Sequence, residues 1–154
     1  MTNGASISSN TFGIGNAGSV TIVARETVSV GGRVPLGQFF LGASIDSQVG
    51  NTGVGNGGEV SVTARTVALN DGFIDSDTFG QGNAGQFTVV AESLEITDRG
   101  RISTTTIGDF DAGDVILTVR DNITVVGENS GILSAATTSS TGDAGYIYID
   151  QQIV

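Results

Sequence analysis

The chain has 154 residues, which is enough for one domain with a substantial core. Its 16 acidic residues outnumber six basic ones, and the net charge of −10 makes nucleic acid and anionic membrane surfaces poor partners. Because the chain contains no Cys and no His, disulfides, thiolate or imidazole metal sites and the usual pairs of nucleophile and base are excluded. No apolar run is long enough to span a bilayer, so we predict no membrane insertion.

Three short strands are predicted within residues 4–30. The first centres on Ile7, and a Gly-Asn-Ala-Gly turn at 15–18 leads into the second, where apolar side chains alternate with polar ones at 20–24. The third strand follows at 28–30 with the same alternation. Apolar residues at every second position are typical of a half-buried strand, and Gly and Asn favour turns between strands.

Residues 31–42 interrupt this pattern and make the first coil longer than those that follow. They contain the only proline, Pro35, and the consecutive apolar residues Phe39, Phe40 and Leu41. We predict a loop insertion here, for which two interpretations stay open. The loop folds over the side or open end of the coils as a local cover, or it presents Phe39, Phe40 and Leu41 as a contact surface for a partner.

The pattern of three strands and a Gly-rich turn then repeats along the rest of the chain. Coils are predicted to start near residues 4, 43, 72, 100 and 131. The last glycine of the turn motif recurs once in each coil, at Gly18, Gly58, Gly85, Gly113 and Gly145. The centre of one strand per coil forms a row of similar aliphatic residues, which we assign as Ile7, Ile45, Ile74, Ile102 and Leu133.

Chemically alike residues at equivalent positions favour stacking of successive coils over pairing of the strands as hairpins. Parallel neighbours in a sheet lie about 4.8 Å apart, so each side chain of one coil rests on its counterpart in the next. The predicted fold is therefore all-β, a right-handed parallel β-helix (β-solenoid) of about five coils with three short strands each. It forms a single domain over residues 1–154. Right-handedness follows only from the general preference of parallel crossovers.

The segments 11–18, Thr-Phe-Gly-Ile-Gly-Asn-Ala-Gly, and 78–85, Thr-Phe-Gly-Gln-Gly-Asn-Ala-Gly, each lead into an alternating strand. They resemble the shaft repeats of filamentous-haemagglutinin-like exoproteins of the cyanobacterial type, which are adhesins of two-partner secretion systems. The resemblance covers residues 4–150 and implies a β-helix exported to the cell surface or the extracellular space, where it acts as a spacer or attachment surface. The family's Asn-Pro-rich secretion motifs and a signal-peptide pattern are absent, so we expect a shaft segment.

Asp46, Asp75 and Asp77 are the best candidates for chemistry in a chain without His and Cys. Asp46 and Asp75 each follow an isoleucine of the aliphatic row, so we expect them side by side on the outer face of adjacent coils. Two carboxylates about 5 Å apart would raise the pKa of one of them, and that spacing occurs in retaining glycosidases. The alternative function is therefore a carbohydrate-active β-helix, a pectinase-like glycan hydrolase or lyase, or a glycan-binding module.

The other coils carry serine at the position of Asp46 and Asp75, and we assign these residues as Ser8, Ser103 and Ser134. This favours a solvated acidic patch without catalysis, so we predict that the chain is not an enzyme. Calcium binding by Asp46, Asp75 and Asp77 is a weaker alternative, because the aspartate ladder of calcium-binding β-rolls is absent. No other metal or cofactor is predicted.

The ends of the solenoid lack visible caps, and residues 151–154 resemble the beginning of another strand. Two hypotheses stay open: copies associate end to end into a filament, or flanking sequence continues a longer rod. Ile116, Tyr146 and Tyr148 are expected to point outward as a lateral contact, with Ile116 and Tyr148 one above the other. We therefore expect a structural segment of an extracellular fibre or adhesin shaft, whose target is a cell surface or a glycan.

Overall fold

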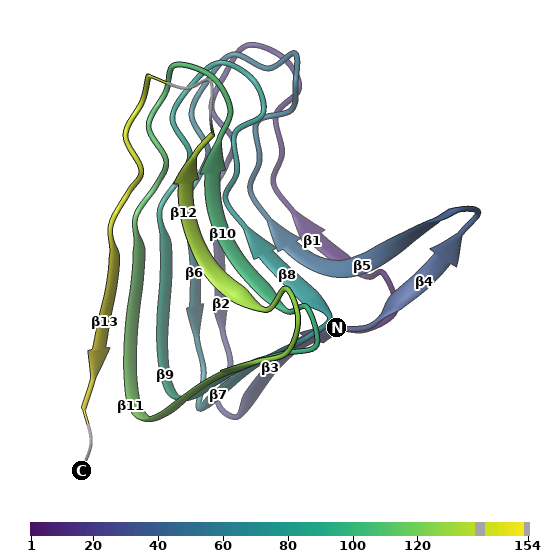
Figure 1. Cartoon of the computed structure of the whole chain (residues 1–154), viewed down its shortest axis with the longest axis vertical. Coiled ribbons are helices and arrows are strands. Elements are labelled where there is room, and N and C mark those ends of the chain that lie inside the picture. The colour runs from purple at the N-terminus through teal and green to yellow at the C-terminus, as the bar shows by residue number, and fades with distance from the viewer. Residues whose placement is uncertain (138–140, 153–154) are drawn as a thin grey trace.

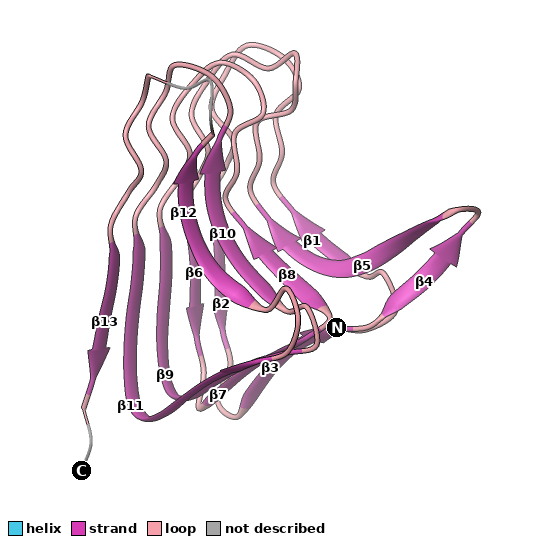
Figure 2. Ribbon diagram, in the orientation of Figure 1, coloured by secondary structure: helices cyan, strands magenta, loops and turns pink. Residues whose placement is uncertain are grey.

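The computed structural model describes residues 1–137 and 141–152, which form β-strands joined by turns and contain no helix (Figure 2). Nothing in this part of the chain forms an apolar helix of membrane-spanning length. Val, Ile and Thr supply many of the strand residues, because β-branched side chains fit a pleated surface that is buried on one face.

The strands stack as three faces of a solenoid (Figure 1). The first face contains β1 (Ser6–Ser8), β5 (Phe39–Asp46), β8 (Gly72–Asp75), β10 (Arg101–Thr106) and β12 (Gly131–Ala136). The second face contains β2 (Val20–Val23), β6 (Val60–Thr63), β9 (Phe87–Thr97), β11 (Val115–Val126) and β13 (Ile147–Gln151). The third face contains β3 (Thr27–Gly31), β7 (Thr66–Asn70) and the second halves of β9 and β11.

The strands that stack between coils pair in parallel, which confirms the predicted β-solenoid. The described chain makes about four turns rather than five, because two faces hold five strands and the third holds four. In the later coils the second and third strands are continuous, as β9 and β11. Three separate strands per coil is therefore too simple a description, while right-handed winding stays a prediction.

The aliphatic row predicted from the sequence is confirmed for its first four members, each of which pairs with the next. The fifth assignment is wrong, because Ile132 pairs with Ile102, whereas Leu133 pairs with Ser103. Successive side chains of a strand point alternately into and out of the solenoid, so a shift of one residue exchanges the inward and outward positions. The turn that precedes β12 sets this register.

The core is a column of aliphatic side chains along the middle of the solenoid. The fully buried members come from all three faces and include Ile45, Val60, Val62, Leu69, Ile74, Phe87, Val89, Leu94, Ile96, Ile102, Val115 and Leu117. Burying one such side chain completely stabilises a fold by about 1.5–3 kcal/mol. Each coil can bury this row only when another coil covers it, so the stability of the solenoid depends on stacking.

The glycine that closes each turn leaves room for a hydroxyl group from the first face. Ser76 Oγ donates a hydrogen bond to Gly58 O at 2.7 Å, and Ser47 Oγ donates one to Gly18 O at 2.8 Å. A Cβ atom at Gly85 would lie 2.1 Å from Gly58 O and 2.4 Å from Ser76 Oγ, so no side chain fits there. Close approach of stacked backbones therefore explains why the turn motif ends in glycine.

The second residue of the turn motif forms a ladder of hydrogen bonds from coil to coil. Asn16 Oδ1 accepts from the backbone N–H of Asn56 at 2.9 Å, and Asn56 Oδ1 accepts from that of Asn83 at 3.0 Å. The backbone N–H of Asp111 donates to Asn83 Oδ1 at 3.1 Å, and that of Asp143 donates to Asp111 Oδ1 at 2.9 Å. Asn and Asp both supply an acceptor oxygen here, so either residue continues the ladder.

The insertion at residues 31–42 forms an antiparallel hairpin from β4 (Arg33–Leu36) and the first part of β5, in which Pro35 pairs with Phe40. Figure 1 shows that the hairpin projects from the side of the solenoid. Its side chains Phe39, Phe40 and Leu41 are exposed, so the local-cover interpretation is wrong. Pairing between its own two arms satisfies the backbone, and the hairpin does not need to lie on the coils.

Candidate functional site

The last described coil leaves its inward side chains uncovered. We call these residues the C-terminal end face: Ile123, Val125, Ile132, Ile147 and Ile149. Ile147 and Ile149 are 44% and 48% exposed, whereas Val115 and Leu117, their partners one coil earlier, are 0% exposed. The alternation in sequence is the same in both strands, so the position along the solenoid decides which residues are buried.

The backbone at this end is open as well. Among the described residues, β12 pairs only with β10, and β13 pairs only with β11. A strand that is paired on one side presents unpaired N–H and C=O groups, which are a template for addition of another strand. The C-terminal end face therefore offers apolar surface and hydrogen-bonding groups to the same incoming coil.

At the N-terminal end, residues 1–3 run alongside β3 and cover part of the core. The backbone N–H of Gly31 donates to Met1 O at 3.0 Å, and Gly31 O accepts from the N–H of Asn3 at 3.2 Å. The Met1 side chain packs against the core, and the inward residues of β3 are buried. Ile7 in β1 is 43% exposed, so the cover over this end is partial.

Asp46 and Asp75 pair directly in register on adjacent coils, which confirms that they lie side by side. Asp46 and Asp75 are 7% exposed and Asp77 is 4% exposed, so the interpretation as a solvated acidic patch is wrong. Arg101 and polar side chains of neighbouring strands pack around the three carboxyl groups. Ser103 occupies the expected place beside Asp75, but Leu133 takes the place assigned to Ser134.

The carboxyl groups of Asp46 and Asp77 have hydrogen-bond partners. Asp46 Oδ1 accepts from Ser44 Oγ at 2.6 Å. Asp77 Oδ1 accepts from Ser103 Oγ and from the backbone N–H of Thr105, both at 2.6 Å. These bonds compensate for the loss of water around buried polar groups.

Asp75 differs, because its Oδ1 is closed off from solvent and accepts no hydrogen bond. Arg101 Nη2 lies 4.0 Å from that oxygen. Burial raises the pKa of Asp75 to about 8; the carboxyls of Asp77 and Asp46 act in the same direction, and Arg101 acts against them. Burial also raises the pKa of Asp77, against its hydrogen bond from Ser103. At neutral pH the Asp75 carboxyl therefore holds a proton.

Burial limits what these carboxyl groups can do with a ligand. Within residues 1–137 and 141–152, no group of three or more acidic side chains is arranged to hold a metal ion. A substrate sugar has no approach to Asp75 Oδ1, because protein atoms cover that oxygen. A general acid must reach the group that it protonates, so the geometry gives the catalytic alternative no support at this atom.

The outward residues near the carboxyl end lie where the sequence predicts them. Ile116 pairs with Tyr148 in register, and both Tyr146 and Tyr148 are exposed. The backbone N–H of Tyr146 donates to Asp114 Oδ1 at 2.8 Å, which ties the start of the last strand to the coil before it. A role of these side chains in lateral contact stays a prediction.

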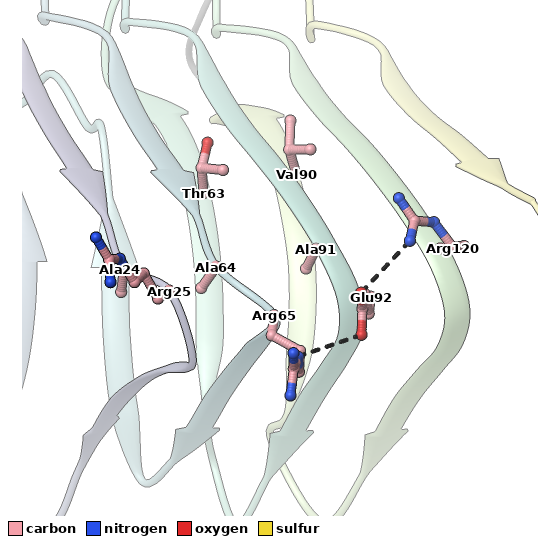
Figure 3. Close-up of a pocket in the computed structure, with 9 residues that line it drawn as sticks. All are labelled: Ala24, Arg25, Thr63, Ala64, Arg65, Val90, Ala91, Glu92 and Arg120. Atoms are coloured by element: carbon pink, nitrogen blue, oxygen red, sulfur yellow. Dashed lines mark hydrogen bonds and ion pairs between the residues drawn. The ribbon is translucent and has the colours of Figure 1, made fainter.

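A ladder of alternating charges, which the sequence patterns did not predict, lies at the outer corner between the second and third faces. Arg65 lies 3.1 Å from Glu26 and 3.6 Å from Glu92, and Arg120 lies 3.4 Å from Glu92. Figure 3 shows the last two of these pairs beside a shallow cavity of about 280 Å³. Exposed ion pairs contribute only about 0–1 kcal/mol each, so the ladder adds little to the stability of the fold. Its signal in the sequence is a charged residue at the same corner in each of the first four coils, whereas the last coil carries Gln152 there.

Comparisons of the chain with protein-family models, with curated proteins and with solved structures found no match. The resemblance to filamentous-haemagglutinin-like repeats therefore stays a prediction. A β-solenoid is compatible with an adhesin shaft and with an enzyme, so the fold by itself does not choose between them.

Proposed function

We propose that the chain is a structural segment of an extracellular fibre or adhesin shaft, and that its C-terminal end face takes a further coil. The observation that carries this proposal is the exposure of Ile147 and Ile149 at positions where the preceding coil is completely buried. The further coil comes from another copy, which forms a filament, or from continuing chain, which forms a longer rod.

The physical driving force is the same in both cases. An added coil buries the aliphatic side chains of the end face, each worth about 1.5–3 kcal/mol when burial is complete. It also pairs with the free edges of β12 and β13, which supplies main-chain hydrogen bonds in register. Head-to-tail stacking along the axis of the solenoid does not close on itself, so repetition produces a rod rather than a ring.

The sides of the solenoid are available for display once the ends are occupied. The exposed side chains Phe39, Phe40 and Leu41 project on the hairpin, and Tyr146 and Tyr148 lie on the second face near the carboxyl end. In this proposal the coils act as a rigid support that holds such groups toward a cell surface or a glycan. Catalysis and a bound cofactor have no part in it.

Sedimentation velocity over a wide concentration range, combined with electron microscopy, tests the filament form. We expect concentration-dependent rods of the width of one solenoid. Ile149→Asp puts a charge into the end face and should leave the chain monomeric. Val90→Asp is the matched control, because Val90 is 44% exposed but lies within β9, away from the end face, and should assemble like the unchanged chain. A profile that is monomeric at every concentration would exclude the filament.

A duplicated coil tests the continuous rod separately. Inserting a second copy of residues 113–144 directly after residue 144 moves the end face outward by one coil. Each added repeat in a solenoid contributes its own interface, so chemical denaturation should show a higher free energy of unfolding and a larger denaturant dependence. A variant that is less stable than the unchanged chain would contradict the idea that the end face accepts another coil.

A further inference from the structure

The six basic residues of the chain are all arginine, and the structure gathers them in two groups. One group lines the outer corner described above: Arg25, Arg65 and Arg120. The other group lies around β8 and the base of the hairpin: Arg33, Arg99 and Arg101. Like charges repel, so the convergence of three guanidinium groups outside the charge ladder points to a negative partner.

A cavity of about 440 Å³ opens between the hairpin and the turns that follow β7 and β9. It is lined by Arg33, Pro35, Phe40, Asp71 and Arg99. Its volume lies in the range of small-molecule sites, which combine an apolar wall with a few polar groups. Pro35 and Phe40 of the hairpin supply the apolar wall, and Arg33 at the base of the hairpin and Arg99 supply the polar wall.

The cationic wall carries more positive charge than its own carboxylate neutralises. Asp71 Oδ1 lies 2.5 Å from Arg33 Nε and 3.2 Å from Arg99 Nε. One carboxylate therefore forms ion pairs with two guanidinium groups, and a net positive charge remains. Arg33 Nε is buried and is not aligned for a hydrogen bond in spite of the short distance. Both ion pairs run through Nε, and no described residue accepts from the terminal amino groups of Arg33 or Arg99.

The third arginine adds to this positive field. Arg33 and Arg101 both lie over the ring of Phe73, with guanidinium carbons 5.4 and 5.7 Å from its centre. Asp75 and Asp77 are the acidic neighbours of Arg101, and burial raises the pKa of both carboxyl groups, that of Asp75 to about 8. Arg101 does not line the cavity itself, and it adds positive charge behind the wall through the shared ring of Phe73.

The apolar wall is accessible to solvent. Pro35 and Phe40 are direct cross-strand partners in the hairpin, and Phe40 is 65% exposed. Side chains alternate along a strand, so Phe39 points to the opposite side of the hairpin from Phe40. An open aromatic face beside two guanidinium groups suits a ligand that has an apolar ring face next to a planar anion.

We propose that this cavity binds a uronic acid residue of an acidic glycan. The sugar carboxylate accepts hydrogen bonds from the terminal amino groups of Arg33 and Arg99, and the C–H face of the sugar ring lies on Phe40. A glycan with one carboxylate per ring meets less repulsion from a chain of net charge −10 than the denser backbone of nucleic acid does. The cavity shares no residue with the C-terminal end face, so this inference holds whether or not rods form.

Isothermal titration calorimetry tests the ligand class on the unchanged chain. A tetrasaccharide of galacturonic acid should bind, whereas its full methyl ester, which keeps the rings and removes the charge, should bind at least about tenfold more weakly. Inorganic phosphate supplies an anion without a ring and should also bind more weakly than the acidic tetrasaccharide. Equal affinity for phosphate or for the ester would overturn the proposal, as would the absence of binding at millimolar concentration.

Two pairs of variants test the residues. Arg99→Gln should weaken binding of the acidic tetrasaccharide by about tenfold or more, whereas Arg120→Gln, which removes the same charge from another exposed arginine, should not. Phe40→Ala should weaken binding to a similar degree, whereas Phe39→Ala should not. All four positions are exposed, and thermal unfolding of each variant checks that the fold is kept. Equal losses for Arg99→Gln and Arg120→Gln would show a general charge effect and contradict the site.

Discussion

The N-terminal and C-terminal ends of the solenoid meet the same physical requirement in different ways. At the N-terminal end, residues 1–3 pair with β3 and bring the Met1 side chain onto the core. At the C-terminal end, the inward residues of β13 remain about half exposed. Residues 1–3 cover only the third face of the first coil. Covering all three faces at one end of the solenoid requires a complete coil.

A pair of isoleucines shows how much a covering coil changes the exposure of the same side chain. Ile102 and Ile132 have the same side chain, lie in the same row and pair directly, but Ile102 is completely buried and Ile132 is only partly so. The difference between them is the coil that covers Ile102 from the other side. Substitution at these two positions therefore measures what one covering coil contributes.

The largest expected effect is on the buried member of this pair. Ile102→Ala should lower the free energy of unfolding by about 2–5 kcal/mol, because it leaves a cavity between two coils. Ile132→Ala should lower it by about 1–2 kcal/mol, because water already reaches part of that side chain. Urea denaturation of both variants checks the prediction, and equal losses would mean that the end face is covered in solution.

A second prediction concerns the buried carboxyl group of Asp75, which destabilises the fold when it loses its proton. The raised pKa of Asp75 means that the folded chain keeps a proton that the unfolded chain loses above about pH 4. Stability should therefore fall as the pH rises from about 4 to about 8. Asp75→Asn, which stays neutral, should remove most of this fall and be more stable at pH 8 by about 1–3 kcal/mol.

The control for this prediction is Asp121→Asn, since Asp121 is exposed. Its curve of stability against pH should match that of the unchanged chain. If Asp75→Asn keeps the full decline between pH 4 and pH 8, another group causes it, and the protonated state of Asp75 is wrong.

The smallest expected effect is at the N-terminal end. Asn3 has a positive φ of 56° and donates to Gly31 O, and proline can satisfy neither requirement. Asn3→Pro should detach residues 1–3 from β3, lower stability by about 1–2 kcal/mol and increase hydrogen exchange in β3. Thr2→Ala keeps the backbone pairing and should change little. Unchanged exchange in β3 of Asn3→Pro would show that the segment does not protect this end.

Several features of the fold could be predicted from local patterns. Alternation of apolar and polar residues located the strands, and recurrence of like residues such as Ile45 and Ile74 predicted parallel stacking in register. The turn motif located the corners, although its ladder of Asn and Asp side chains was not anticipated. The interruption at residues 31–42 located the insertion, but its projection as a hairpin depends on pairing between its own arms.

The candidate site was less accessible to prediction. Asp46 and Asp75 were correctly placed side by side, because register follows from the repeat. Their burial was not predicted, since it depends on Arg101 and Asn10, which come from other coils. The register of Leu133 was missed for a related reason, because the length of the preceding turn decides which residue of β12 faces the core.

By itself, the sequence determined the period-2 strands, the glycine turns and the stacking of equivalent residues, because each depends on neighbours along the chain or on exact repetition. Only the tertiary structure decided which carboxyl group keeps a proton and which arginines meet beside Phe40. The physical reason is that the charge and solvation of a side chain depend on groups a few ångströms away in space. In this fold those groups lie a full coil away along the chain.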